Sequence, residues 1–63
     1  MKYQIGELVA AEGWGTEGIQ IGIIVGIGGG GWYYTVYWNK GEKETHHVTQ
    51  IEIFKEVLNA RVV

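Results

Sequence analysis

Four consecutive glycines, followed at once by aromatic and β-branched residues, constrain this chain more than any other feature. The glycines are Gly28–Gly31, and the run that follows is Trp32–Trp38, with the sequence WYYTVYW. Aromatic and β-branched side chains suit the pleated surface of a strand, so the run predicts a strand that begins where the glycines end. Ordering four glycines costs much backbone entropy. We therefore expect a hairpin tip at Gly28–Gly31, between this strand and the one before it.

The same glycines have the spacing of a dinucleotide-binding fingerprint, at Gly26, Gly28 and Gly31. That fingerprint works only where a strand enters the glycines and a helix leaves them, because the amino terminus of the helix supplies the N–H groups that hold the phosphate. Here a predicted strand follows instead of a helix. The spacing therefore indicates a turn and not a phosphate site.

The rest of the chain predicts further short strands. The five expected strands cover residues 7–11, 20–27, 32–38, 42–48 and 51–54. Asn39-Lys40-Gly41 is a turn signal, and residues 48–50 form a tight turn before the last strand. Phe54, Val57, Leu58 and Arg61 fall at helical spacing, so the tail 55–63 is predicted as a short helix or an extension.

Five short strands with little room for a helix predict an all-β fold that closes into a small barrel, because closure removes exposed strand edges. The length of 63 residues fits a single domain over 1–63, with its core at about 5–54. The expected core consists of the inward residues of the strands: Val9, Ile24, Val36, Val48, Ile51 and Ile53.

Composition narrows the classes of function. The net charge is −2 and the five basic residues are scattered, which argues against a nucleic-acid surface, where basic residues cluster. No apolar run approaches the roughly 20 residues of a membrane span, and no signal-type stretch follows Met1. We expect a soluble, cytoplasmic protein.

No catalytic residue, metal site or cofactor is predicted. The chain has no cysteine and no serine, and its threonines lack an evident base partner. His46 and His47 are adjacent on a predicted strand, so their side chains point to opposite faces and do not chelate one ion. The enzyme class is therefore disfavoured.

Five short motifs carry a resemblance to a known fold. They are Gly6-x-x-Val9-Ala10, Gly22-x-Ile24-Val25-Gly26, Tyr34-x-Val36, Gly41 and Val48-x-x-Ile51-Glu52. Together they resemble the SH3-like small barrel over about residues 5–54. The resemblance implies a five-stranded barrel, and it points to two branches with different functions.

The first branch is Tudor-like. Its members often bind methylated lysine or arginine in an aromatic cage, through the attraction of a cation to ring faces. The resemblance implies that such a cage would draw on the aromatic residues of the first loop and third strand, with Glu42 and Glu44 as acidic neighbours. Those aromatic residues are Trp14, Trp32, Tyr33, Tyr34, Tyr37 and Trp38.

The second branch is the type II dihydrofolate reductase, a similar barrel that assembles as a tetramer around a central active-site pore. The segments GIIVG and VTQIEIF are similar to its second strand and its end. Its active stretch Val-Gln-Ile-Tyr would match Lys43, Glu44, Thr45 and His46, so the glutamine and isoleucine that contact cofactor and substrate are absent. The resemblance implies the assembly but not the activity.

Strand alternation indicates where partners bind. Tyr34, Val36 and Trp38 share one face of the third strand, so Tyr33 and Tyr37 point outward. The second strand, IGIIVGI, is apolar on both faces, and soluble monomers seldom expose large apolar patches. We predict a non-catalytic binding or assembly module that forms a homo-oligomer or binds a protein or peptide, with a pore enzyme or a Tudor-like reader as the alternatives. The predicted interaction residues are Trp14, Trp32, Tyr33, Tyr37 and Trp38.

Overall fold

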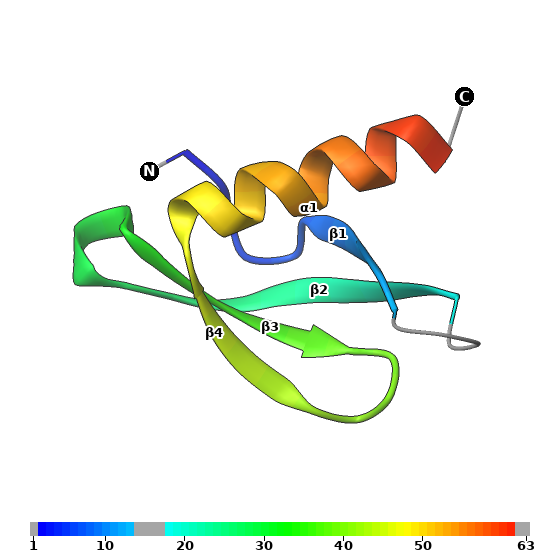
Figure 1. Ribbon diagram of the computed structural model, residues 1–63. Helices are drawn as coiled ribbons and strands as arrows, with labels where there is room; N and C mark the ends of the chain where they lie inside the picture. The colour runs from blue at the N-terminus through cyan, green and yellow to red at the C-terminus, as the bar shows by residue number, and fades with distance from the viewer. Residues whose placement is uncertain (1, 14–17, 62–63) are drawn as a thin grey trace.

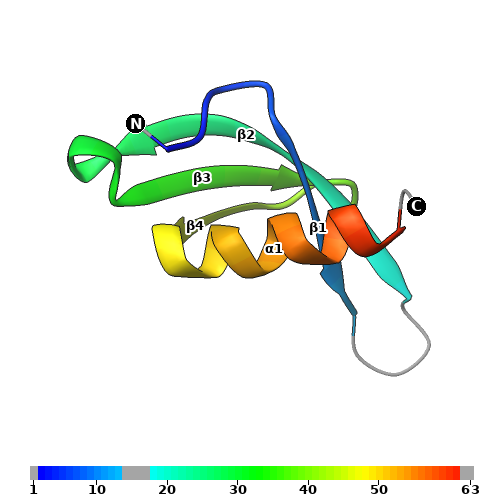
Figure 2. The ribbon, with the colours of Figure 1, turned by 90° about the horizontal axis from the view of Figure 1, so that it is seen from above.

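The computed structural model describes residues 2–13 and 18–61. An antiparallel sheet of four strands carries one helix against one of its faces (Figures 1 and 2). The strands lie in chain order across the sheet, with β1 and β4 at its edges. The elements are β1 Leu8–Glu12, β2 Ile19–Gly28, the short 3₁₀ turn η1 Gly29–Gly31, β3 Tyr33–Trp38, β4 Lys43–His47 and α1 Val48–Arg61.

Both predicted turns around β3 are confirmed. Gly29, Gly30 and Gly31 have φ of 60°, 69° and 100°, a left-handed conformation that favours glycine. They connect β2 to its antiparallel neighbour β3, so a strand both enters and leaves the glycines. At the other turn Gly41 has φ of 93°, and its N–H donates to the Trp38 carbonyl at 2.9 Å.

The predicted five-stranded barrel is wrong. The sheet is open, and the segment predicted as a tight turn and a fifth strand, residues 48–54, forms the first half of α1. The helical spacing predicted for the tail is present, but the helix begins at Val48, six residues earlier than that spacing indicated.

The helix is favoured because its buried residues recur every three positions. Val48, Ile51 and Phe54 face the sheet and are at most 9% exposed, whereas Ile53 is 51% exposed. In a strand, Ile51 and Ile53 would share a face. Glu52 and Lys55 also suit a helix intrinsically, and the helical phase lets both of them reach charged partners near the amino terminus.

The core lies between α1 and the face of the sheet that it covers, which we call the inner face. The prediction that Ile53 is a core residue is wrong, because the helical phase places it at the surface. The other predicted core residues are buried. Tyr34 and Trp38 are buried beside Val36, as strand alternation predicted. The core cluster is Tyr3, Val9, Ile24, Tyr34, Val36, Trp38, Val48, Ile51 and Phe54.

Gly22 allows the largest ring of the core to lie against the sheet. A Cβ at this position would lie 2.5 Å from Val36 Cγ1 and 2.7 Å from Trp38 Cε3. Phe54 of α1 then meets the Trp38 ring edge-on, with 5.1 Å between ring centroids. The close approach at Gly22 therefore makes room for the helix above the indole.

A β-bulge changes the phase of β2. Ile24 pairs with Val36 and Gly26 pairs with Thr35, so Val25 and Gly26 together oppose one residue of β3. After the bulge, Ile27 pairs with Tyr34 and packs against the core. Regular alternation from Ile24 would place Ile27 on the outward side with Val25, and the bulge turns it toward the core instead.

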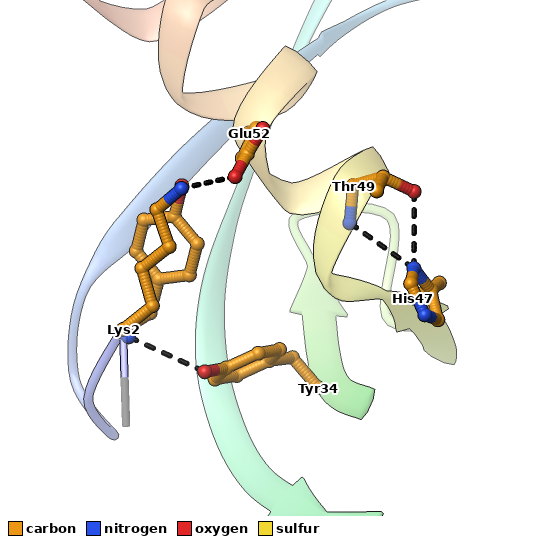
Figure 3. A network of polar contacts seen from close by, with 6 residues as sticks. Lys2, Tyr34, His47, Thr49 and Glu52 are labelled. Carbon is orange, nitrogen blue, oxygen red and sulfur yellow. Dashed lines mark hydrogen bonds and ion pairs between the residues drawn. The ribbon is translucent and has the colours of Figure 1, made fainter. Parts of the chain in front are cut away.

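The amino-terminal arm ties the helix to the sheet (Figure 3). The backbone N–H of Tyr3 donates to the Tyr34 hydroxyl at 3.3 Å, and the Tyr3 ring meets the Tyr34 ring edge-on. Lys2 forms an ion pair with Glu52 of α1. These contacts bring residues about fifty positions apart to the same end of the molecule.

Glu7 and Lys55 form a second link between the sheet and the helix. Lys55 Nζ lies 3.2 Å from Glu7 Oε1 and donates to the Leu8 carbonyl at 3.1 Å. The hydrogen bond from the Gln4 backbone N–H holds the pKa of Glu7 below its ordinary value near 4.5, with a further contribution from Lys55 and against an opposing effect of burial.

Two substitutions test the helical phase of residues 48–54. Ile51→Ala removes a fully buried side chain and should lower the free energy of unfolding by about 2–5 kcal/mol. Ile53→Ala changes an exposed side chain and should stay within about 0.5 kcal/mol. Urea unfolding of both variants measures the difference. Equal losses would mean that the two isoleucines share a buried face, as in a strand.

Glu7 should contribute to stability in a pH-dependent way. Because its pKa is lower in the folded chain than in the unfolded chain, its contribution is present above about pH 4.5 and is lost as the pH falls through the folded pKa. Glu7→Gln should therefore show a smaller loss of urea midpoint between about pH 6 and about pH 3 than the wild type. Glu56→Gln, an exposed glutamate of α1, is the control. A wild-type acid response in Glu7→Gln would contradict the prediction.

Candidate interaction surface

The face of the sheet opposite α1 is apolar and uncovered by the described residues (Figure 1). We call it the outer face. Its large side chains are between 36% and 49% exposed. They are Leu8 of β1; Ile21, Ile23 and Val25 of β2; and Tyr33 and Tyr37 of β3. A contiguous apolar surface of this kind marks an interaction site more often than a solvated one.

Strand pairing arranges the outer face in three rows that differ in bulk. The bulkiest row pairs Leu8 with Ile23 and Ile23 with Tyr37. The middle row is small, with the Thr35 and Thr45 hydroxyls 3.1 Å apart. The third row runs from Gly28 through Tyr33 to His47.

Charged side chains lie at the margin of this surface. Lys43 extends the bulky row at the β4 edge, where it pairs with Tyr37. Beside the bulky row, a shallow apolar groove is lined by Leu8, Ile21, Ile23, Tyr37 and Asn39. Burying this surface would therefore require little desolvation of charge.

The two edges of the sheet are both protected against pairing with another strand. At β1, the helix packs alongside, and Lys55 caps the Leu8 carbonyl. At β4, Lys43 and Glu44 place charges on the edge, which opposes strand addition. The outer face, and not an edge, is therefore the surface open to a partner.

Trp32 lies beside the glycine tip and is 60% exposed. Its ring stacks on His47 at 5.9 Å between centroids, and Tyr33 meets the same imidazole edge-on at 5.3 Å. Its carbonyl accepts a hydrogen bond from the Val48 N–H at 2.8 Å. These contacts attach Trp32 to the start of α1 and extend the aromatic surface beyond the end of β3.

His47 also caps the amino terminus of α1 (Figure 3). Its Nδ1 accepts a hydrogen bond from the Thr49 backbone N–H at 3.3 Å and lies 3.0 Å from the Thr49 hydroxyl. A side-chain acceptor before a helix satisfies one of the free N–H groups of its first turn. The imidazole ring therefore links the outer-face aromatics to the helix that covers the inner face.

His46 points the other way, as its position on a strand predicted. Its ring meets Phe54 at 5.0 Å and Trp38 at 6.1 Å, both edge-on, and its Nε2 lies 3.2 Å from Glu44. Trp38 and Phe54 also line a recess whose rim includes Glu42 and Glu44. Trp38 Nε1 is buried without a hydrogen-bond partner in the described residues.

The structure separates the residues predicted to bind a partner. Tyr33 and Tyr37 share the outer face, with Trp32 next to them at the tip. Trp38 is 4% exposed on the inner face and so belongs to the core. Trp14 lies outside the described residues. Sequence reasoning did not include Leu8 in this surface; it faces outward because it pairs with Ile23.

The described residues hold no metal site and no membrane-spanning helix, and comparisons with known proteins give no match. In residues 2–13 and 18–61 there is no group of three or more histidine or acidic side chains placed to hold a metal ion. The one α-helix of the described chain is too short and too polar to cross a membrane. No family model, curated protein or solved structure matches this chain.

The capping role of His47 predicts a specific pattern of stability. His47→Ala removes the acceptor for the Thr49 N–H and should cost about 0.5–2 kcal/mol. His47→Asn keeps an acceptor in this position and should recover most of the loss. Urea unfolding compares the three proteins. If the asparagine variant is as unstable as the alanine variant, packing against Trp32 and Tyr33 is the main role of the ring.

Proposed function

We propose that this chain is a small non-catalytic assembly module that self-associates through the outer face of the sheet. The observation that carries the proposal is the apolar surface of Leu8, Ile21, Ile23, Val25, Tyr33 and Tyr37, which is exposed although the same chain buries a complete core on the other face. Exposing such a surface to water is unfavourable by about 25 cal/mol per Å².

The size of the surface supports a weak association. With about 200 Å² for each full side chain, six side chains exposed by roughly two-fifths offer about 500 Å². Two such surfaces together bury about 1,000 Å², at the lower limit for a specific interface. The expected complex is therefore reversible and concentration-dependent.

The chemistry of the site supports binding in preference to catalysis. The two histidines are occupied in packing and capping, with His47 bound to Thr49 and His46 placed between Phe54 and Glu44. The outer face presents aliphatic and aromatic side chains around a pair of threonine hydroxyls. These groups bury area and supply no evident acid–base pair.

A matched pair of variants tests the proposal. Ile23→Lys places a charge in the bulky row of the outer face and should abolish self-association, because the charge would have to be desolvated in the complex. Ile53→Lys makes the same change at an exposed position of α1, away from the outer face, and should leave association intact. Sedimentation velocity over a range of concentrations measures both.

Two results would contradict the proposal. One is a wild-type chain that sediments at its 7.0 kDa mass at every concentration. The other is equal association of the Ile23→Lys and Ile53→Lys variants. Urea unfolding of both variants excludes loss of the fold as the cause of a change in mass.

A further inference from the structure

We infer that the partner of the outer face is a second copy of this chain, related to the first by a twofold axis that runs across the strands through Thr35. The inference rests on the proposed function, and it specifies how the two surfaces meet. In this arrangement the two sheets pack face to face, with their β3 strands antiparallel. Tyr33 of each copy then lies over Tyr37 of the other.

The first argument is the internal symmetry of β3. Tyr33 and Tyr37 lie two residues before and two residues after Thr35, on the same face, and are 49% and 45% exposed. In a twofold interface, if one residue contacts a second across the axis, the second also contacts the first. An axis at Thr35 satisfies this condition with two equivalent pairs of tyrosines, a type of contact that aromatic rings favour.

The second argument is the difference in bulk between the two β2 residues on either side of the middle row, Ile23 and Gly28. A rotation about the middle row brings the bulky row of Leu8, Ile23 and Tyr37 over the row that begins at Gly28. Gly28 has no side chain and faces open space, so it leaves room for an isoleucine of the partner. An axis running along β3 would instead bring β2 of one copy over β4 of the other, so that Ile23 would lie over Lys43 and Gly28 over His47.

The third argument is charge. A partner with a strongly charged surface would find no matching charges on the outer face, where Lys43 stands at the margin. A second copy presents the same uncharged centre. The small middle row also lets the two backbones approach each other, because only Thr35, Thr45, Val25 and Gly26 occupy it.

Single-cysteine cross-linking tests the position and the direction of the axis. The native chain has no cysteine, so each variant carries one thiol. Facing sheets pack about 10 Å apart, a distance that bismaleimidoethane spans and a disulfide does not. The four variants are Thr35→Cys, Thr45→Cys, Lys43→Cys and Asn59→Cys. Sedimentation of each variant before cross-linking shows whether it still associates.

An axis across the strands passes through both Thr35 and Thr45, because these residues pair in one row. Thr35→Cys and Thr45→Cys should therefore each give at least tenfold more cross-linked dimer than Lys43→Cys, whose two copies are separated by about four residues' rise along the strand. Asn59→Cys on α1 should give only background. Using both threonine positions keeps the test valid if one substitution weakens association.

The outcomes separate this inference from the proposed function. If both variants associate but only Thr35→Cys cross-links, the axis runs along β3, and the stated direction is overturned. If the wild type is a dimer but the associating threonine variants cross-link no better than Lys43→Cys, the twofold arrangement is wrong. The proposal of an assembly module is then unaffected. A monomeric wild type would overturn both.

Discussion

The close contact between Trp38 and Gly22 is the constraint on which the rest of this structure depends. Because Gly22 has no Cβ, the indole lies against β2 at a distance that any other residue would obstruct. Phe54 then packs edge-on against the indole and fixes α1 above the inner face. Residues 2–13 and 18–61 provide one α-helix for two sheet faces, so the helix covers the inner face and leaves the apolar outer face open.

The central part of the fold could be predicted from local sequence. Glycines that need positive φ, next to residues that favour strands, determine both hairpins around β3. The helix could not be predicted in the same way, because Ile51-Glu52-Ile53 alternates like a strand whereas Val48, Ile51 and Phe54 fit a helical period. Contacts distant in sequence favour the helix: Lys2 with Glu52, and Lys55 with Glu7.

The side chains of the candidate surface could be placed only in part, for a similar reason. Alternation along β3 correctly placed Tyr33 and Tyr37 outside and Tyr34 inside. It also placed Trp38 on the inner face, although Trp38 was among the predicted interaction residues, and the structure buries its ring in the core against Gly22. The bulge in β2 is the second obstacle, because an extra residue reverses the phase for Ile27.

The polar pair at the centre of the outer face determines how costly burial would be. A hydroxyl that is buried without a partner costs about 1–3 kcal/mol, so two isolated threonines would oppose association. Thr35 and Thr45 instead share a hydrogen bond across the strands, which leaves a single hydroxyl proton to satisfy. Burying the threonine hydroxyls would then oppose association only slightly, compared with the favourable free energy of burying Ile23, Tyr33 and Tyr37. The strand pairing that builds the sheet therefore also lowers the cost of burying these hydroxyls in the proposed face-to-face contact.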